Sequence, residues 1–279
     1  MLWLGYFRNI AGSSPLVFLD DAEFAKHIDA NRVRIRGNGR EAGTHRCSLR
    51  VDTKHKDGRM IRVGAHQPNF LPWPGFWHKL ISSDVFVVCA GFQYRRRGYE
   101  NRVIMRDNGR WATIPVSGGL VPSKQVKIAD PKVPARLARR IKHWSEMRRY
   151  RYRHRLKPII ERLERNTDAL LSPLNYDLIA LTLETLGHHS TKLVLDMKTR
   201  AGMSIGEVIT DIVTAHGDTY LCGPSSPNYV SRRDLTGIDK VFVQKLYPGM
   251  PSETVLHLIA EQENPVAALR AIGAWEPWD

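Results

Sequence analysis

The chain has 279 residues, of which 42% are hydrophobic, and a formal net charge of +14 at pH 7. This length and composition suit one large domain, or one domain with an appendage. No apolar run approaches the roughly 18 residues that span a bilayer, and the chain does not open with a secretory signal, so a cytoplasmic location is expected. The three cysteines, Cys47, Cys89 and Cys222, are too far apart in sequence to predict a disulfide framework or a zinc site.

The beginning of the chain is a partial repeat of a later segment. Trp3–Arg40 aligns without gaps on Trp73–Arg110, with 11 identities in 38 positions. The copy lacks a first strand, so it cannot close a core alone. It is either a remnant of tandem duplication or an extension upstream of a natural start at Met60. We expect residues 1–59 to be an appendage with a linker, and residues 60–279 to be the main domain.

The main domain opens with a strand, a helix and a second strand. Ile61–Ala65 is a short apolar strand, Pro74–Ser82 a helix with proline in its first turn, and Val85–Val88 a buried strand. Arg102–Met105 and Trp111–Val116 are joined by an Asn-Gly pair that favours a hairpin.

Three helices are expected next, because apolar residues recur at helical spacing from Val133, from Tyr152 and from Pro173. Strands and helices then alternate to the end: strands at 192–195, 219–221 and 240–244, and helices at 204–215, 253–260 and 265–272. This pattern predicts an α/β fold, with a mostly parallel sheet covered by helices and a central helical insertion.

Two loops leave the ends of predicted parallel strands, where ligands bind in such sheets. His66–Trp73 follows the first strand, and Cys222–Tyr229 follows a later one. His66 suits a base or a hydrogen-bond donor because imidazole titrates near neutrality. A histidine hydrogen-bonded in a loop for structural reasons is the alternative.

The run from Val63 to Trp73, with Gly75, Phe76, Trp77 and Lys79, resembles the opening signature of the WbqC-like family. Gln93-Tyr94, Asn101-Arg102, Trp111–Val116 and Tyr220–Tyr229 follow in the family's order, so the resemblance covers about residues 60–260. It implies a role in bacterial surface-polysaccharide (O-antigen) synthesis, as a transferase that adds an acyl or aminoacyl group to an amino sugar. A modified base of phage nucleic acid is an alternative acceptor.

The resemblance also implies which residues act. His66 and Gln67 are expected at the reacting centre, and Lys79 and Arg102 are expected to hold an anionic group. The remaining substrate-binding candidates are Asn69, Gln93, Asn101, Gly223, Ser225 and Tyr229, with Pro68 and Pro224 in the same motifs.

Two departures from the family pattern concern acidic residues. The resemblance implies a pair of aspartates after the second strand, where this chain has Ala90-Gly91, although the repeat keeps Asp20-Asp21 there. His257 stands where the family tends to have an acid. If those acids bind a metal or take part in proton transfer in the family, this protein is altered, inactive, or completed by the appendage or a second chain.

Most of the positive charge lies between Lys132 and Lys157, where eleven Lys or Arg residues and one acid, Glu146, leave a net charge of +10. Arg148, Arg149, Arg151 and Arg153, with Trp144, Tyr150 and Tyr152 among the basic residues to stack on bases, suit a polyanion such as nucleic acid. A nucleotide-sugar, coenzyme A or polyphosphate would also suit it, and a solvated helix face is the structural alternative.

Two rival functions stay open beside the transferase. One is a nucleotidylyltransferase, although its His-x-Gly-His signature would need histidines where Trp73 and Phe76 stand. The other is a non-enzymatic nucleic-acid-binding protein. The sequence contains neither a P-loop nor a GxGxxG fingerprint, so the cofactor is left unassigned, and no metal site is predicted.

Overall fold

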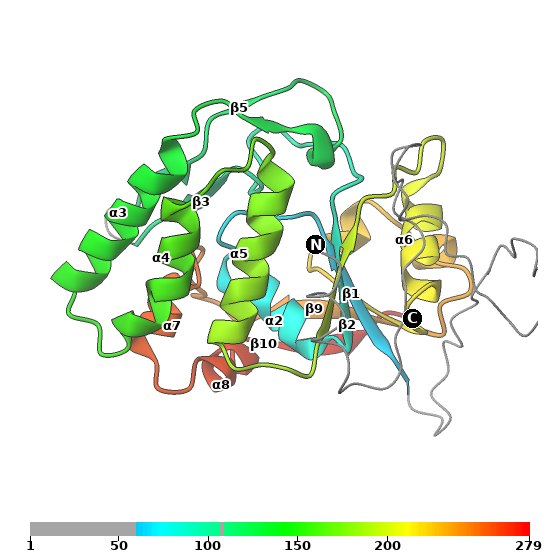
Figure 1. Cartoon of the computed structure of the whole chain (residues 1–279). Helices are drawn as coiled ribbons and strands as arrows, with labels where there is room; N and C mark the ends of the chain where they lie inside the picture. The colour runs from blue at the N-terminus through cyan, green and yellow to red at the C-terminus, as the bar shows by residue number, and fades with distance from the viewer. Residues whose placement is uncertain (1–59, 107–108) are drawn as a thin grey trace, which may run out of the picture. The chain divides into compact units, whose positions relative to one another are not determined.

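The computed structural model describes residues 60–106 and 109–279, which are coloured in Figure 1. The repeat over Trp3–Arg40 lies outside these residues and stays a prediction. At the centre is one six-stranded sheet, in which every neighbouring pair is parallel except the last two strands at one edge. Its strands, side by side, are β10 (Gly273–Pro277), β9 (Lys240–Leu246), β8 (Thr219–Cys222), β1 (Arg62–His66), β2 (Val85–Cys89) and β7 (Lys192–Asp196). The expectation of a mostly parallel sheet is confirmed.

The order of the parallel strands is that of a doubly wound sheet. If the parallel strands β1, β2, β7, β8 and β9 are numbered 1 to 5 along the chain, their order across the sheet, starting from β7, is 3-2-1-4-5. From β1 the chain passes through α2 (Pro74–Ser82) to β2 on one side, whereas from β8 it continues to β9 on the other side. The ends of β1 and β8 are therefore the point at which the winding reverses.

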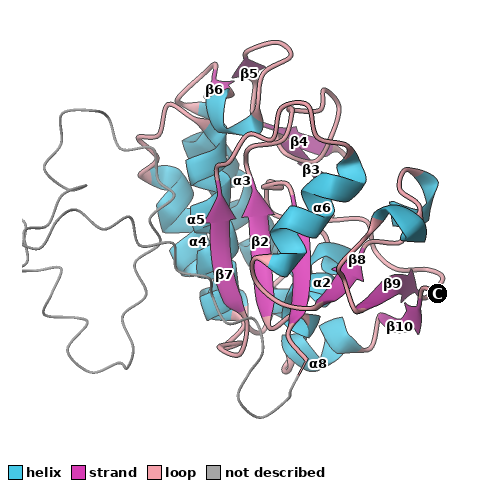
Figure 2. Ribbon diagram, turned by 90° about the vertical axis from the view of Figure 1, so that its right-hand side faces the viewer, coloured by secondary structure: helices cyan, strands magenta, loops and turns pink. Residues whose placement is uncertain are grey.

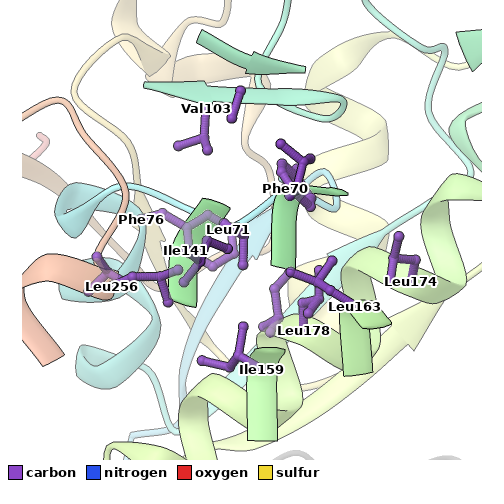
Figure 3. Close-up of a cluster of buried hydrophobic side chains, with 14 of the residues drawn as sticks. Phe70, Leu71, Phe76, Val103, Ile141, Ile159, Leu163, Leu174, Leu178 and Leu256 are labelled. Atoms are coloured by element: carbon purple, nitrogen blue, oxygen red, sulfur yellow. The ribbon is translucent and has the colours of Figure 1, made fainter. Parts of the chain in front are cut away.

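Helices cover both faces of the sheet (Figure 1). One core joins the sheet to α2, α3 (Val133–Met147), α4 (Lys157–Glu164), α5 (Leu171–Thr185), α7 (Leu256–Glu261) and α8 (Pro265–Arg270), as Figure 3 shows for residues including Phe70, Phe76 and Leu178. The other core lies between the sheet and α6 (Ile205–Thr214). Along β2, Phe86 and Val88 belong to the first core, and Val87 and Cys89 to the second. The strand is apolar on both faces because both faces are covered.

Local signals fixed several element boundaries. The α2 helix has the expected bounds, with proline in its first turn. The Ser204 hydroxyl accepts from the Glu207 amide and the Glu207 carboxylate accepts from the Ser204 amide, so a capping box starts α6.

Between β2 and β7 the chain forms two small hairpins and three helices. In Figure 2 the hairpins lie beyond the carboxyl ends of β2 and β7. The first pairs β3 (Arg102–Ile104) with β4 (Trp111–Thr113), as expected. The second pairs β5 (Val116–Ser117) with β6 (Lys127–Ile128), separated by the 3₁₀ turn η2 (Ser123–Gln125). The expected strand over Trp111–Val116 was thus too long, because β4 ends at Thr113 and Val116 pairs elsewhere.

Two other expectations need correction. The helix expected from Tyr152 begins only at Lys157, as α4: the chain turns at Arg149, where φ is 51°, and then forms the 3₁₀ turn η3 (Arg153–Leu156). The sequence analysis also missed β10, which runs antiparallel to β9. Within the described part of the chain, no helix has both the length and the apolarity to cross a membrane.

Candidate active site at the reversal of the sheet

The two loops predicted to carry the chemistry leave neighbouring strands at the same edge of the sheet. Gly64 of β1 pairs with Leu221 of β8 in parallel register, so His66 lies level with the start of the Gly223–Tyr229 loop. In doubly wound sheets, ligands bind in the crevice at this reversal point. The fold therefore brings His66 and Gln67 to the position where such proteins hold their substrates.

His66 is neutral at physiological pH. Burial is the main cause that lowers its pKa, the nearby Lys79 ammonium is the second, and together they bring it from 6.5 to about 3. The Nδ1 atom lies 3.1 Å from the Gln67 carbonyl oxygen, and the ring packs edge-on against Phe76. A carbonyl oxygen can only accept, so Nδ1 carries the proton and Nε2 keeps the lone pair. The side chain is thus arranged as a hydrogen-bond acceptor.

Lys79 is a buried cation beside the same strand end. Its Nζ donates to the Ala65 carbonyl oxygen over 2.8 Å, and its side chain lies over the Phe86 ring. No carboxylate among residues 60–106 and 109–279 forms an ion pair with it. Burial lowers its pKa from 10.5 to about 8. A binding site for an anion at Lys79 therefore stays a prediction, supported by an unneutralised charge.

We expect Lys79→Met to stabilise the fold by about 2 kcal/mol at pH 7. The lowered pKa corresponds to roughly 3 kcal/mol of desolvation cost, offset by about 1 kcal/mol for the lost hydrogen bond. Between pH 8 and 10.5 the Lys79 amine is more often protonated in the unfolded wild-type chain than in the folded one, so the free energy of unfolding of the wild type rises with pH over this range. Urea unfolding at pH 7 and pH 9 measures both effects, with Lys240→Met at an exposed site as control. Destabilisation by Lys79→Met, or retention of the pH slope, contradicts this account.

Gln67 and Gln93 meet through one hydrogen bond. The Gln67 side-chain amide donates to the Gln93 carbonyl oxygen over 3.0 Å. Gln93 in turn lines an open pocket of ≈ 460 Å³ at the carboxyl ends of β2 and β7. The hydrogen bond between these two candidate residues therefore links the loop after β1 to the pocket at the ends of β2 and β7.

The missing aspartate pair has a structural counterpart. Ala90 is fully buried, and a Cβ atom added to Gly91 would lie 1.8 Å from the Lys198 carbonyl oxygen. An aspartate at position 91 cannot fit unless the segment after β7 moves. The close approach of Lys198 therefore excludes a side chain at position 91, where the resemblance implies an aspartate.

Asn101 and Arg102 have partners within the fold. The Asn101 amide donates to the Ile114 carbonyl oxygen over 3.0 Å. The Arg102 guanidinium donates to the carbonyl oxygens of Arg97 and Gly98 and stacks over Trp111 at 4.1 Å. These contacts shape the loop and hairpin, and the substrate-binding role expected of both residues stays a prediction.

The loop after β8 forms the 3₁₀ turn η4 (Ser226–Asn228). Ser225 and Tyr229 are exposed, Gly223 is half-buried, and the Tyr229 hydroxyl bonds to the Ser226 hydroxyl over 2.9 Å. Asn69 is buried in the loop after β1. Of the candidates in the loop after β8, Ser225 and Tyr229 are thus exposed to a ligand beside the reversal point of the sheet.

Sequence reasoning missed two residues that support this edge. The Asn175 amide of α5 donates to the carbonyl oxygens of Pro68 and Glu100, each over 2.7 Å, which joins the loop after β1 to the segment before β3. Glu100 is only 3% exposed, and burial raises its pKa to about 7. A single acid beside three arginines in the sequence gave no signal of burial.

The basic segment has a different form from the one expected. Arg148, Arg149, Arg151 and Arg153 are exposed, and none of them has an ion pair within the described ranges. However, Trp144 is buried and Tyr150 packs edge-on against it. The interpretation that these aromatics stack on bases is therefore wrong for Trp144.

Two more aromatic and basic residues of this segment are engaged within the fold. Tyr152 lies under Arg155, whose guanidinium also donates to the Gln262 carbonyl oxygen. A pocket of ≈ 480 Å³ beside these residues is lined by both signs of charge, including Arg151, Arg153, Glu161 and Glu164. Its mixed lining favours a solvated surface over a dedicated polyanion groove.

The fold and the loops at its reversal point define a doubly wound α/β protein with its candidate site at the carboxyl edge of the sheet. Across the described residues, His, Cys, Asp and Glu side chains do not gather in threes as metal ligands. The chain belongs to the WbqC-like protein family, whose sequence model matches residues 2–63 and 67–251. His66 falls between the matched segments, so its role rests on its position at the strand end. Neither a curated protein nor a solved structure matches the chain.

Proposed function

We propose that the protein is a transferase that moves an acyl or aminoacyl group onto the amine or hydroxyl of an amino-sugar or modified-base acceptor. The observation that carries this proposal is His66, the last residue of β1, a neutral imidazole whose Nδ1 donates to the Gln67 carbonyl oxygen so that its Nε2 keeps the lone pair. Acyl transfer needs such an acceptor, because the attacking group must lose a proton as it bonds to carbon.

In the proposed reaction the acceptor's N–H or O–H donates to Nε2 of His66. Its nitrogen or oxygen bonds to the acyl carbon, the bond from that carbon to the leaving group breaks, and the proton passes through His66 to the leaving group. The Lys79 charge is one cause of the low pKa of His66. An anionic donor that pairs with Lys79 therefore raises the basicity of His66 when the complex forms.

The positions of Trp73 and Phe76 favour acyl transfer over nucleotidylyl transfer. Phe76 is buried in the core, and Trp73 packs against it. Phe76 has no hydrogen-bond donor and Trp73 offers only its indole N–H, so the two residues lack the paired imidazoles with which the rival signature would contact phosphates.

The test is a transfer assay on the full chain. Acyl and aminoacyl thioesters and adenylates are offered as donors, with nucleotide-linked amino sugars and aminated bases as acceptors, and products are weighed by mass spectrometry. We expect the acceptor to gain the mass of one acyl group. A product that gains a nucleotidyl group, or no acylated product across the panel, contradicts the proposal.

The rival function, nucleic-acid binding, is tested at the four exposed arginines at positions 148, 149, 151 and 153, although the acids that line the neighbouring pocket favour a solvated surface. If they contact phosphates, the affinity for DNA or RNA falls by about 0.7–0.9 log units per contact for each tenfold rise in salt concentration. Changing all four to serine should then reduce the slope of log affinity against log salt by about 3 units. Filter binding between about 50 and 200 mM salt measures this. Arg95→Ser/Arg96→Ser, at exposed positions elsewhere, should leave the slope unchanged. No retention at the lowest salt, or equal slopes in both variants, excludes this function.

A further inference from the structure

Most of the side chains that line the ≈ 460 Å³ pocket at the carboxyl ends of β2 and β7 are apolar, and Gln93, Lys198, Thr199 and Arg200 are its polar members. Its walls include Phe92, Leu120, Val121, Pro122, Met203 and Ile205. Leu120 is 81% exposed, Met203 40% and Ile205 38%. A single exposed apolar residue needs no explanation, but several around one hollow indicate a surface that an apolar group covers.

The walls of this pocket are held in place before any ligand binds. The Ala90 amide donates to the Asp196 carbonyl oxygen and the Lys124 amide to the Ala90 carbonyl oxygen, each over 2.8 Å. Arg200 bridges Asp196 and Asp211 with contacts of 2.7 Å to each carboxylate. A preorganised pocket loses little binding energy to ordering when a ligand enters.

The pocket is connected to the proposed reacting centre. Gln93 lines it, and the Gln93 carbonyl oxygen accepts from Gln67, the neighbour of His66. A group seated among the apolar walls can therefore extend along Gln67 toward the end of β1. The pocket volume suits a small molecule rather than a protein segment.

We propose that this pocket binds the aliphatic chain of the transferred acyl group, and that it selects donors by chain length. The proposal rests on the transferase function and adds its substrate class. Aliphatic side chains on several walls match an aliphatic chain, and the hydrogen bond from the Ala90 amide to the Asp196 carbonyl oxygen joins the two strand ends whose following loops line the hollow.

The test uses binding of straight-chain carboxylates (butyrate, hexanoate and octanoate) to the full chain, measured by calorimetry or NMR. Each added CH₂ should tighten Kd about fourfold while the chain remains inside the pocket. Ala201→Trp, at an exposed position in the wall, should abolish this dependence, whereas Ala267→Trp on α8 should retain it. Leu120→Ser should weaken octanoate several-fold and leave butyrate unchanged.

A wild-type Kd that is independent of chain length overturns the proposal, as does the same dependence in Ala201→Trp. Binding is measured without turnover, so this result is separate from the transfer assay. Chain-length dependence without any transfer would contradict the transferase and leave an apolar binding site. Acyl transfer without any chain-length dependence of binding would support the transferase function and overturn the proposal that the pocket binds the acyl chain.

Discussion

Replacing His66 with asparagine is expected to lower kcat for acyl transfer by about 10²- to 10⁴-fold, the usual contribution of a positioned acid–base group. Asparagine removes the Nε2 acceptor but keeps a polar side chain that can reach the Gln67 carbonyl oxygen, so the loop should keep its shape. Because burial, together with the Lys79 charge, keeps the imidazole neutral, kcat/KM of the wild type should show no inflection near pH 6.5. Steady-state kinetics from pH 5 to 9 measure both effects.

The control for this variant is His189→Asn, at an exposed position in the turn after α5. It changes the same residue type without touching the carboxyl edge, and its kcat should equal that of the wild type. Equal rates in His66→Asn and His189→Asn would remove His66 from the chemistry. A wild-type inflection near pH 6.5 that His66→Asn abolishes would instead show that His66 titrates normally.

The second large effect is expected at Glu100, where glutamine should stabilise the fold by about 2 to 3 kcal/mol at pH 8. Burial raises the pKa of Glu100 from 4.5 to about 7, so the folded chain holds this proton more tightly than the unfolded chain. Wild-type stability should therefore fall as pH rises from 4.5 to 7, by roughly 3 kcal/mol from this group. Glutamine has the same shape and carries no charge, so this loss disappears.

Urea unfolding at pH 5, 6, 7 and 8 measures the difference between the two chains. Glu184→Gln, at an exposed position on α5, should parallel the wild type at each pH. Because Asn175 joins the Glu100 and Pro68 carbonyls, ionisation of Glu100 is also expected to loosen the loop after β1. A Glu100→Gln variant that is less stable than the wild type at pH 8 would mean that the carboxylate has a stabilising partner.

Elements with strong local signals could be predicted closely from the sequence. The start of α2 follows from its proline, and the start of α6 from its capping box. Apolar runs on alternating strands and helices were sufficient to predict a mostly parallel sheet covered by helices, and the structure has a core on each face. These signals work because hydrogen bonds and periodic burial within one segment decide whether it is a helix or a strand.

Elements that depend on distant partners could not be predicted in this way. Val116 looks like a continuation of β4 and instead pairs with β6, and β10 exists because β9 offers it an edge. The basic segment has helical spacing, yet turns at Arg149 before α4 begins. In each case the energy that decides the conformation comes from packing against residues far away in sequence.

The sequence by itself determined the α/β class, the family resemblance, and the placement of His66 and Gln67 at a strand end. Only the tertiary structure decided that β1 lies between β2 and β8, that Gln67 reaches Gln93, and that Glu100 is buried. The physical reason is that a strand end is set by local pattern, whereas charge, pKa and pocket shape depend on which distant side chains surround it.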